Sequence, residues 1–445
     1  MNRRIIRKSL LGMFALTTLS LSAQVDIQPD VQYYRAPGYD GLNTFESKKD
    51  NQTPFAGLKV RVGGDFALQF QGISHENKWN SDSLSGVSEL TNLGSNFNLP
   101  TANLNLDVQL ADGLRMHLRT YLSSRHHNDA YVKGGYIQMD KLDFIKDGFL
   151  SNIMDFTTIR IGMDELNYGD AHFRRSDNAS AIYNPFVGNY IMDAFTTEAF
   201  AELTFLPNDF IIVGGVSNGN LNQSVRVTSG QENKMSVYAK LGWDKQVNED
   251  TRIRITGSFI TSPGYYNGGW LYEGDRSGAR YYHVMEEAGA NDDFRSGRFN
   301  PNFKKFNSFQ INPFVKWKGL EFFGIYEMAM GDKADDESKF DDKYTMKGGS
   351  YTQLGAELIY RFGSWDQFYG GVRYNSVSGY GSEFEKDDFS TGINRLNVGV
   401  GWFLTKNVMA KLEYVNQSYT GDGYQGSKFE DGNFNGVMFE AVIGF

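Results

Sequence analysis

Apolar and polar side chains alternate with a period of two residues along most of this chain, and no other feature constrains its fold as strongly. The clearest run begins near residue 58. Its apolar face consists of Leu58, Val60, Val62, Phe66, Leu68 and Phe70. Its polar face consists of Lys59, Arg61, Asp65, Gln69 and Gln71. This alternation indicates a β-strand with two different faces, and about eleven residues are enough for a tilted strand to cross a bilayer.

The same alternation recurs down the chain and predicts sixteen strands. They are 58–71, 103–110, 114–122, 130–140, 156–164, 196–206, 210–217, 234–243, 251–262, 305–317, 320–330, 351–362, 366–376, 393–404, 408–418 and 434–445. The runs 130–140 and 210–217 are the weakest, because either face could be the apolar one. Pro313 cannot donate a hydrogen bond to a neighbouring strand, so we expect a local irregularity around it.

The connections between these strands alternate between long and short. The long ones are 73–97, 165–195, 218–233, 263–304, 331–350, 377–392 and 419–433, and the short ones are 111–113, 207–209, 244–250, 318–319, 363–365 and 405–407. Outer-membrane barrels have short periplasmic turns and long extracellular loops. We therefore predict an all-β fold, a transmembrane antiparallel β-barrel of about sixteen strands, with both termini periplasmic.

Two connections depart from this rhythm. The link 125–129 is short where a long one is expected. The link 141–155 is long where a short turn is expected, and its sequence indicates a small periplasmic helix.

Aromatic side chains gather at the predicted periplasmic turns. They are Phe205, Trp243, Trp317, Phe362, Trp365 and Trp402. Such a girdle is typical of a membrane interface. The last predicted strand places Phe439, Ile443 and Phe445 on one face, which looks like the signal that the outer-membrane insertion machinery reads. A soluble, secreted β-sandwich or propeller also alternates, but it does not account for the loop rhythm, the girdle and Phe445 together.

The first 23 residues predict an export signal. Arg3, Arg4, Arg7 and Lys8 precede a short apolar stretch, and small residues precede Gln24. These are the features of a signal peptide. We therefore divide the chain into a signal peptide (1–23), an irregular periplasmic or lumenal lead segment (24–56) and an outer-membrane β-barrel (57–445).

Composition excludes several classes of protein. Beyond the N-terminal region no stretch approaches 18 uninterrupted apolar residues, so helical membrane spans are not expected. The absence of cysteine excludes disulfides, thiolate metal sites and a cysteine nucleophile. A net charge of −9 gives no footprint for nucleic acid. The G-x-S-x-G pattern at 215–219 precedes a polar loop instead of a helix, and the histidines lack zinc-ligand spacing. We predict no catalytic residue, metal site or cofactor.

Three early motifs and one later block resemble outer-membrane porins of the Bacteroidetes type. The motifs are Tyr33-Tyr34-Arg35, Asn43-Thr44-Phe45-Glu46 and the run from Thr53 to Arg61, and the most specific block is Gly169 to Glu198. The resemblance covers the whole mature chain and implies a porin barrel with passive solute passage. A looser similarity to the phosphate-selective porin O and P group rests on architecture and lumen arginines.

The connection 165–195 is the strongest pointer to function. In general porins the loop after the fifth strand folds into the barrel and narrows it, so the resemblance implies the same here. Tyr183, Phe186 and Tyr190 are unusual in an exposed loop, which independently favours packing against an inner wall. An outer loop packed on its neighbours is the alternative.

Charges on the polar faces of the strands should face water, because a lipid-facing charge costs about 2–4 kcal/mol at the midplane. We expect the pore and its constriction to be lined by Arg61, Arg115, Arg119, Arg160, Asp170, Arg174, Arg175, Asp177, Tyr190 and Asp193. A basic wall facing an acidic loop would set up a transverse field across the pore. Cross-strand ion pairs that merely hold the lumen open are an equally good interpretation.

These observations predict an integral protein of the bacterial outer membrane that acts as a passive pore for small hydrophilic solutes. The alternative is a non-conducting structural or assembly-partner barrel. For the protein in either role, the expected partners are outer-membrane lipid and lipopolysaccharide, the insertion machinery and small polar solutes. Nucleic acid is not an expected partner, and a homotrimer is one compatible assembly.

Overall fold

The computed structural model describes most of the chain downstream of the predicted export signal. The described residues are 28–47, 49, 53–78, 89–123, 130–174, 180–220, 225, 234–263, 270–272, 281–289, 296–334, 346–381 and 390–445. The predicted signal peptide (1–23) and the predicted short link 125–129 lie outside them.

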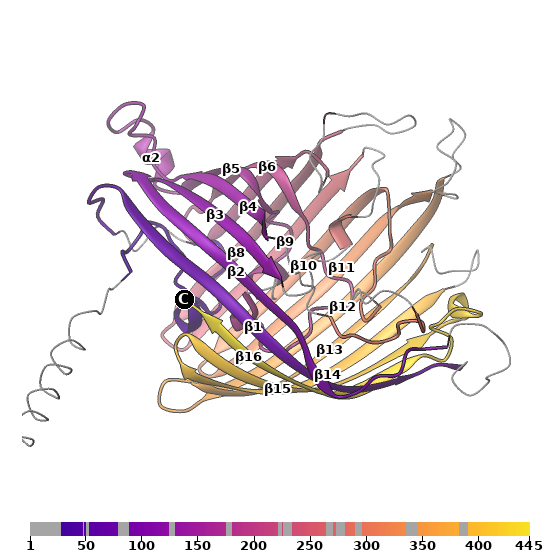
Figure 1. The fold of residues 1–445 in the computed structure, drawn as a ribbon. Helices are drawn as coiled ribbons and strands as arrows, with labels where there is room; N and C mark the ends of the chain where they lie inside the picture. The colour runs from indigo at the N-terminus through magenta and orange to yellow at the C-terminus, as the bar shows by residue number, and fades with distance from the viewer. Residues whose placement is uncertain are drawn as a thin grey trace, which may run out of the picture.

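The described residues form sixteen strands that close into one antiparallel barrel (Figure 1). The strands are β1 (Lys59–Glu76), β2 (Asn96–Ala111), β3 (Leu114–Ser123), β4 (Ala130–Met139), β5 (Thr157–Glu165), β6 (Thr197–Phe205), β7 (Phe210–Ser217), β8 (Ser236–Asn248), β9 (Thr251–Ser262), β10 (Lys305–Trp317), β11 (Leu320–Ala334), β12 (Met346–Phe362), β13 (Phe368–Tyr380), β14 (Thr391–Thr405), β15 (Val408–Thr420) and β16 (Asn433–Gly444). Each strand pairs with its neighbours in sequence, and β16 pairs with β1. The predicted antiparallel β-barrel and all sixteen predicted strands are confirmed.

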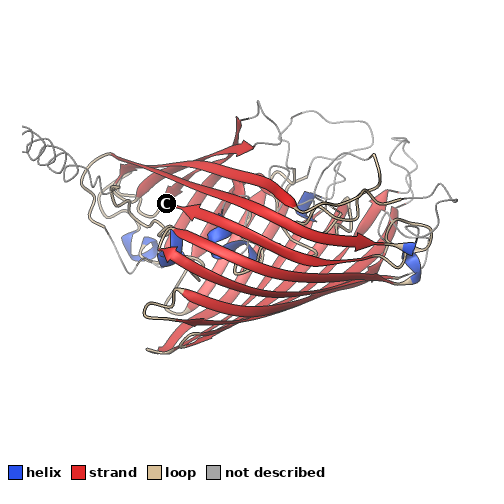
Figure 2. Ribbon diagram, turned by 60° about the horizontal axis from the view of Figure 1, so that its bottom comes forward, coloured by secondary structure: helices blue, strands red, loops and turns tan. Residues whose placement is uncertain are grey.

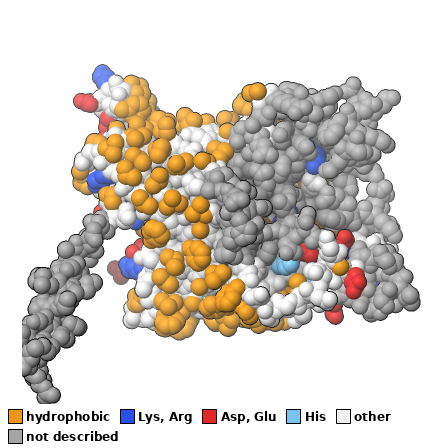
Figure 3. Space-filling view, viewed as in Figure 1, with side chains coloured by type: hydrophobic (Ala, Val, Ile, Leu, Met, Phe, Trp, Pro, Cys, Tyr) orange, Lys and Arg blue, Asp and Glu red, His pale blue; other side chains and the backbone are white. Residues whose placement is uncertain are grey.

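Successive side chains on a strand point to opposite sides of the wall, as the alternation predicts. On β8, Lys240 is fully buried inside the barrel while its neighbour Leu241 is 63% exposed on the outside. The outward apolar side chains form a hydrophobic band around the strands (Figure 3). Trp317, Phe362 and Trp402 of the predicted girdle are exposed at the short-turn end of this band.

Pro313 disturbs β10 less than expected. The register with β11 is the same before and after it, from Ile311 opposite Tyr326 to Phe314 opposite Phe323. Pro313 lacks an N–H, and the Asn312 side-chain amide donates instead to the Gly324 carbonyl at 3.1 Å. Gly324 also leaves room for the proline ring, because a Cβ there would lie 2.8 Å from Pro313 Cγ. The predicted irregularity is therefore confined to the hydrogen bonds.

The helix predicted for 141–155 is wrong for most of its length. Only Ser151–Met154 is helical, as α2, and the rest is a series of turns. Gly148 and Leu150 both have positive φ angles, of 67° and 55°. A residue in this left-handed conformation interrupts a helix, so a continuous helix cannot form here.

The remaining helices among the described residues are single turns. They are η1 (Gly38–Gly41), η3 (Ala171–Phe173), η4 (Ser180–Tyr183), η5 (Trp270–Tyr272) and η6 (Asp422–Tyr424). Figure 2 shows these turns in blue beside the much longer strands. None of the helices in the described part of the chain has the length and apolar character needed to cross a membrane.

Candidate functional site

Residues 28–47 of the lead segment contact inward-facing side chains of the barrel. Tyr39 N donates to Lys406 O at 2.7 Å in the β14–β15 turn, and the Tyr39 ring packs against Phe403. Farther along, Glu46 forms ion pairs with Lys240 (2.9 Å) and Arg254 (2.7 Å). The segment therefore enters the barrel at the end that carries the short turns.

The connection between β5 and β6 lies against the inner wall as well. Asp170 is fully buried and pairs with Lys240 (2.9 Å) and Arg254 (2.8 Å), and it accepts a hydrogen bond from Thr256 (2.8 Å). Burial alone would raise the pKa of Asp170 and of Glu46, but Arg254 and Lys240 outweigh it and hold both pKa values below their ordinary range. The cluster joins this connection and the lead segment to β8 and β9.

Farther along the same connection, backbone groups bind polar side chains of β12, β13 and β15. Val187 N donates to Glu413 (2.8 Å), Ile191 N to Asn375 (2.7 Å) and Met192 N to Gln353 (3.0 Å). The Tyr190 hydroxyl donates to Glu357, and burial followed by that carboxylate raises the Tyr190 pKa well above its usual value. This part of the connection therefore fills the lumen beside β12, β13 and β15.

Arg174 lies in the middle of this packing and is 3% exposed. Its Nη2 lies 3.4 Å from Glu357 and 3.9 Å from Glu321. The guanidinium also faces the rings of Phe314 and Phe323, with 5.3 and 5.1 Å to the ring centroids. Both carboxylates also pair with other arginines, Glu321 with Arg361 and Glu357 with Arg373. Arg174 therefore belongs to a buried network of charges.

In the described part of a third segment, 281–304, the chain covers the end of the barrel that carries the long loops. Gln71 donates to His283 O at 2.7 Å, and Tyr419 donates to Ser296 O at 2.9 Å. Tyr282 is fully buried, and its hydroxyl donates to Glu413 at 2.5 Å. This cap and the two segments below it occupy most of the lumen beside β8–β15.

The wall formed by β1–β5 is different, because two adjoining cavities lie along it. One is about 200 Å³ and the other about 180 Å³. They share Arg35, Arg115, Tyr136, Arg160 and Phe173 as lining residues. Thr158 lines the smaller and Glu165 the larger, and at roughly 3.3 Å per residue these positions of β5 are about 23 Å apart. The two cavities together therefore follow β5 along nearly its whole length.

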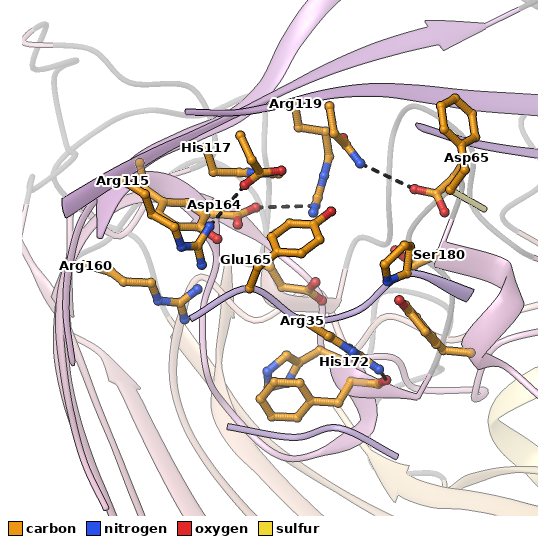
Figure 4. Close-up of a pocket in the computed structure, with 18 residues that line it drawn as sticks. Arg35, Asp65, Arg115, His117, Arg119, Arg160, Asp164, Glu165, His172 and Ser180 are labelled. Carbon is orange, nitrogen blue, oxygen red and sulfur yellow. Dashed lines mark hydrogen bonds and ion pairs between the residues drawn. The ribbon is translucent and has the colours of Figure 1, made fainter. Parts of the chain in front are cut away.

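Charged side chains dominate the larger cavity. Arg115, Arg119 and Arg160 project from the barrel wall, and Arg35 faces them from the lead segment (Figure 4). Four carboxylates share the lining, from Asp65, Asp107, Asp164 and Glu165. The cavity is therefore polar, and its formal charges are balanced.

Most of these arginines have a carboxylate partner. Arg115 and His117 both lie 3.0 Å from Asp107. Arg119 lies 3.6 Å from Asp164, and Arg160 lies 2.8 Å from Glu202.

Arg35 differs from them. Its guanidinium donates to the Gly41 and Phe173 carbonyls and lies 3.8 Å from the centroid of the Tyr183 ring. Among the described residues no carboxylate lies within ion-pair distance of it.

The lining also has hydrogen-bonding capacity that the protein does not use. Asn105 Oδ1, Asp107 Oδ2, Arg115 Nε and His117 Nε2 have no hydrogen-bond partner among the described residues. Buried polar atoms in proteins are normally satisfied. Atoms that lack a partner among the described residues also occur on the packed side of the lumen, for example Gln310 Oε1 and Asn397 Oδ1. Those of the larger cavity adjoin open space, which suits water or a polar solute.

The predicted site residues therefore fall into separate groups. Arg115, Arg119 and Arg160 line the larger cavity. Asp170, Arg174, Tyr190 and Asp193 are buried in contacts within the lumen packing. Arg61 lies on β1 with its guanidinium 5.2 Å from the Tyr34 ring centroid, and Arg175 and Asp177 lie outside the described residues.

Sequence reasoning did not select Arg35 as a site residue. Its only signal was its place in Tyr33-Tyr34-Arg35, an aromatic and basic triplet in an otherwise polar lead segment. Metal binding has no candidate either, since the described part of the chain contains no group of three His, Asp or Glu side chains placed to hold an ion.

Comparison with known proteins gives structural matches alone. No family model matches the sequence, and no curated protein matches it. The outer-membrane channel DcaP of Acinetobacter baumannii superimposes with a TM-score of 0.50 at 10% identity, over 88% of this chain and 98% of that one. The chain is an integral outer-membrane β-barrel.

Two further solved structures give similar values. The anion-selective porin from Comamonas acidovorans has a TM-score of 0.49 at 10% identity, over 87% of this chain and 100% of that one. OmpT of Vibrio cholerae has a TM-score of 0.48 at 10% identity, over 87% and 98%. Of these three, DcaP alone reaches a TM-score of 0.50, and at 10% identity that likeness bears on the fold and not on the solute.

Proposed function

We propose that this outer-membrane barrel is a passive porin for small hydrophilic solutes, and that solutes move along the β1–β5 wall. The observation that carries the proposal is the pair of adjoining polar cavities that follow β5 along nearly its whole length. A passage lined by charged and hydrogen-bonding groups admits solutes that can exchange their hydration for these contacts. No turnover or cofactor is needed.

In this proposal the β5–β6 connection forms the constriction. Its contacts with β8, β9, β12, β13 and β15 support this role, because they fill the lumen opposite the β1–β5 wall. Size exclusion is then set by the cavities, and Arg35, Arg115, Arg119 and Arg160 tune the response to solute charge. We further propose that the protein is a porin of the Bacteroidetes type and that residues 1–23 direct its export. We also propose that it assembles as a homotrimer.

A second candidate function is a non-conducting structural or assembly-partner barrel. One observation favours it specifically. The lead segment, the β5–β6 connection and residues 281–304 together bury large side chains such as Phe186, Tyr190 and Tyr282 inside the lumen. A barrel plugged along its whole section would hold these contacts and conduct little.

Cysteine modification in planar bilayers separates the two functions. The chain contains no cysteine, so Ser180→Cys introduces a single thiol into the lining of the larger cavity. If the cavity is the path, a charged thiosulfonate reagent will reduce the single-channel current of this variant severalfold. Glu249→Cys, exposed in the β8–β9 turn, is the matched control and should be labelled without loss of current. An unmodified protein that inserts but shows no channels would establish the non-conducting barrel.

A further inference from the structure

The link between β4 and β5 exposes a cluster of large apolar side chains. Within residues 141–156, which we call the β4–β5 projection, the exposed members are Phe144, Ile145, Phe149, Leu150, Ile153 and Phe156. Ile145 is 60% exposed and Ile153 54%, whereas Met154 is buried toward the barrel. α2 projects beyond the ends of β5 and β6 in Figure 1. The projection therefore presents an apolar surface at the end of the barrel that carries the short turns.

These side chains are held by a folded scaffold. Backbone hydrogen bonds of 2.9 Å close its turns, from Ile145 N to Leu142 O and from Phe149 N to Lys146 O. Lys49 ties it to the barrel by donating to the carbonyls of Asp140 (2.8 Å) and Met154 (2.6 Å). The apolar surface is therefore a built feature of the fold.

The surface continues into the lipid-facing band. Phe156 packs edge-on against Phe205 at 6.3 Å between ring centroids, and Phe210 and Ile137 are exposed nearby on the outer wall. Figure 3 shows hydrophobic side chains of the projection running into those of the band. Because the apolar surface of the projection is continuous with the lipid-facing band, lipid can cover both.

We propose that the β4–β5 projection inserts into the periplasmic leaflet of the outer membrane, at the boundary between headgroups and acyl chains. Interfacial segments of this kind combine exposed apolar side chains with flanking charges that stay at headgroup level. Lys146 and Asp147 are exposed within the projection and supply such charges. Large exposed apolar patches mark membrane or protein contacts, and continuity with the band favours lipid. The proposal does not depend on whether the barrel conducts.

Spin-label accessibility in reconstituted bilayers tests whether the β4–β5 projection inserts into lipid. A nitroxide label is attached to the Ile153→Cys variant of the otherwise cysteine-free protein. The labelled protein is then reconstituted in bilayers of phosphatidylethanolamine and phosphatidylglycerol. Glu249→Cys, exposed in the β8–β9 turn at the same end of the barrel, is the matched control. We expect collisions with a water-soluble nickel chelate to be at least threefold less frequent at 153 than at 249, and collisions with oxygen to be more frequent.

Ile145→Cys provides a second position with the same expectation, in case one label disturbs the turn. Equal nickel accessibility at 145, 153 and 249 would overturn the proposal. Shielding that appears only after a periplasmic protein fraction is added would also overturn it, in favour of a protein partner.

Discussion

Arg174 shows how a charge inside a barrel can be structural. It is buried between Glu321 and Glu357, and these carboxylates also pair with Arg361 and Arg373. Loss of Arg174 therefore leaves both carboxylates with a cation partner and costs about 1.5–3 kcal/mol, the value for a hydrogen bond to a charged group. We expect Arg174→Gln to lower the free energy of unfolding by about that amount, measured by urea titration in lipid, and to leave the reversal potential in a salt gradient unchanged. A shifted reversal potential with normal stability would place Arg174 on the solute path instead.

Arg35 should behave in the opposite way. It faces the larger cavity, and its partners among the described residues are carbonyl groups and the Tyr183 ring. A fixed positive charge with no carboxylate in ion-pair contact attracts anions in a narrow, low-dielectric space, and the carboxylates of the same lining oppose it in part. Arg35→Gln should therefore shift the reversal potential toward cation preference, and Arg35→Lys should retain most of the wild-type value. An unchanged potential in Arg35→Gln would show that ions do not pass this residue.

At the scale of the element, the two faces of each strand should respond differently to the same side chain. Leu106 points outward on β2 opposite Leu118 of β3, and Asn105 lines the larger cavity. Leu106→Arg should destabilise the barrel by about 2–4 kcal/mol, because it exposes a charge to lipid near the midplane. Asn105→Arg is the matched control and should fold normally in the same heat-modifiability assay. Equal tolerance would contradict the assignment of the faces.

Docking of the lead segment should weaken only in acid. Arg254 and Lys240 hold the pKa values of Glu46 and Asp170 below the ordinary values of 4.5 and 3.8. Lowered folded-state pKa values mean that the stabilisation is present above the ordinary values and is lost as the pH falls through the folded-state values. Hydrogen exchange of residues 36–46 should stay slow at pH 5 and accelerate only below about pH 4. Glu46→Gln should exchange faster at neutral pH, and acceleration near pH 6 would exclude these carboxylates as the cause.

At the scale of the whole molecule, closure of the barrel depends on its last strand. Phe445 N donates to Gly64 O at 3.0 Å, and Gly64 N donates to Phe445 O at 3.1 Å. Closure removes the unpaired strand edges that would otherwise be exposed to lipid. Phe445→Asp places a charge on the lipid-facing side and should reduce the amount of folded protein in outer-membrane fractions. Phe439→Leu is the control that keeps an apolar side chain, and wild-type levels of Phe445→Asp would reject the prediction.

The sequence by itself determined the strands and their two faces, because side-chain alternation is a local consequence of extended backbone geometry. It could not exclude the helix expected at 141–155, where positive φ angles at Gly148 and Leu150 interrupt the backbone. The sequence predicted the residues of the site less completely than it predicted the fold. Arg115 and Arg119 were predicted from parity and do line the larger cavity.

Only the tertiary structure decided which charges face open space. Arg174 meets Glu357, which lies 183 residues away in the sequence, whereas Arg35 meets no carboxylate among the described residues. No periodicity encodes these pairings, because they depend on how three separate segments fold into one lumen. Inside the barrel, a charge is neutralised or left facing water according to its distance from partners that closure of the barrel brings together.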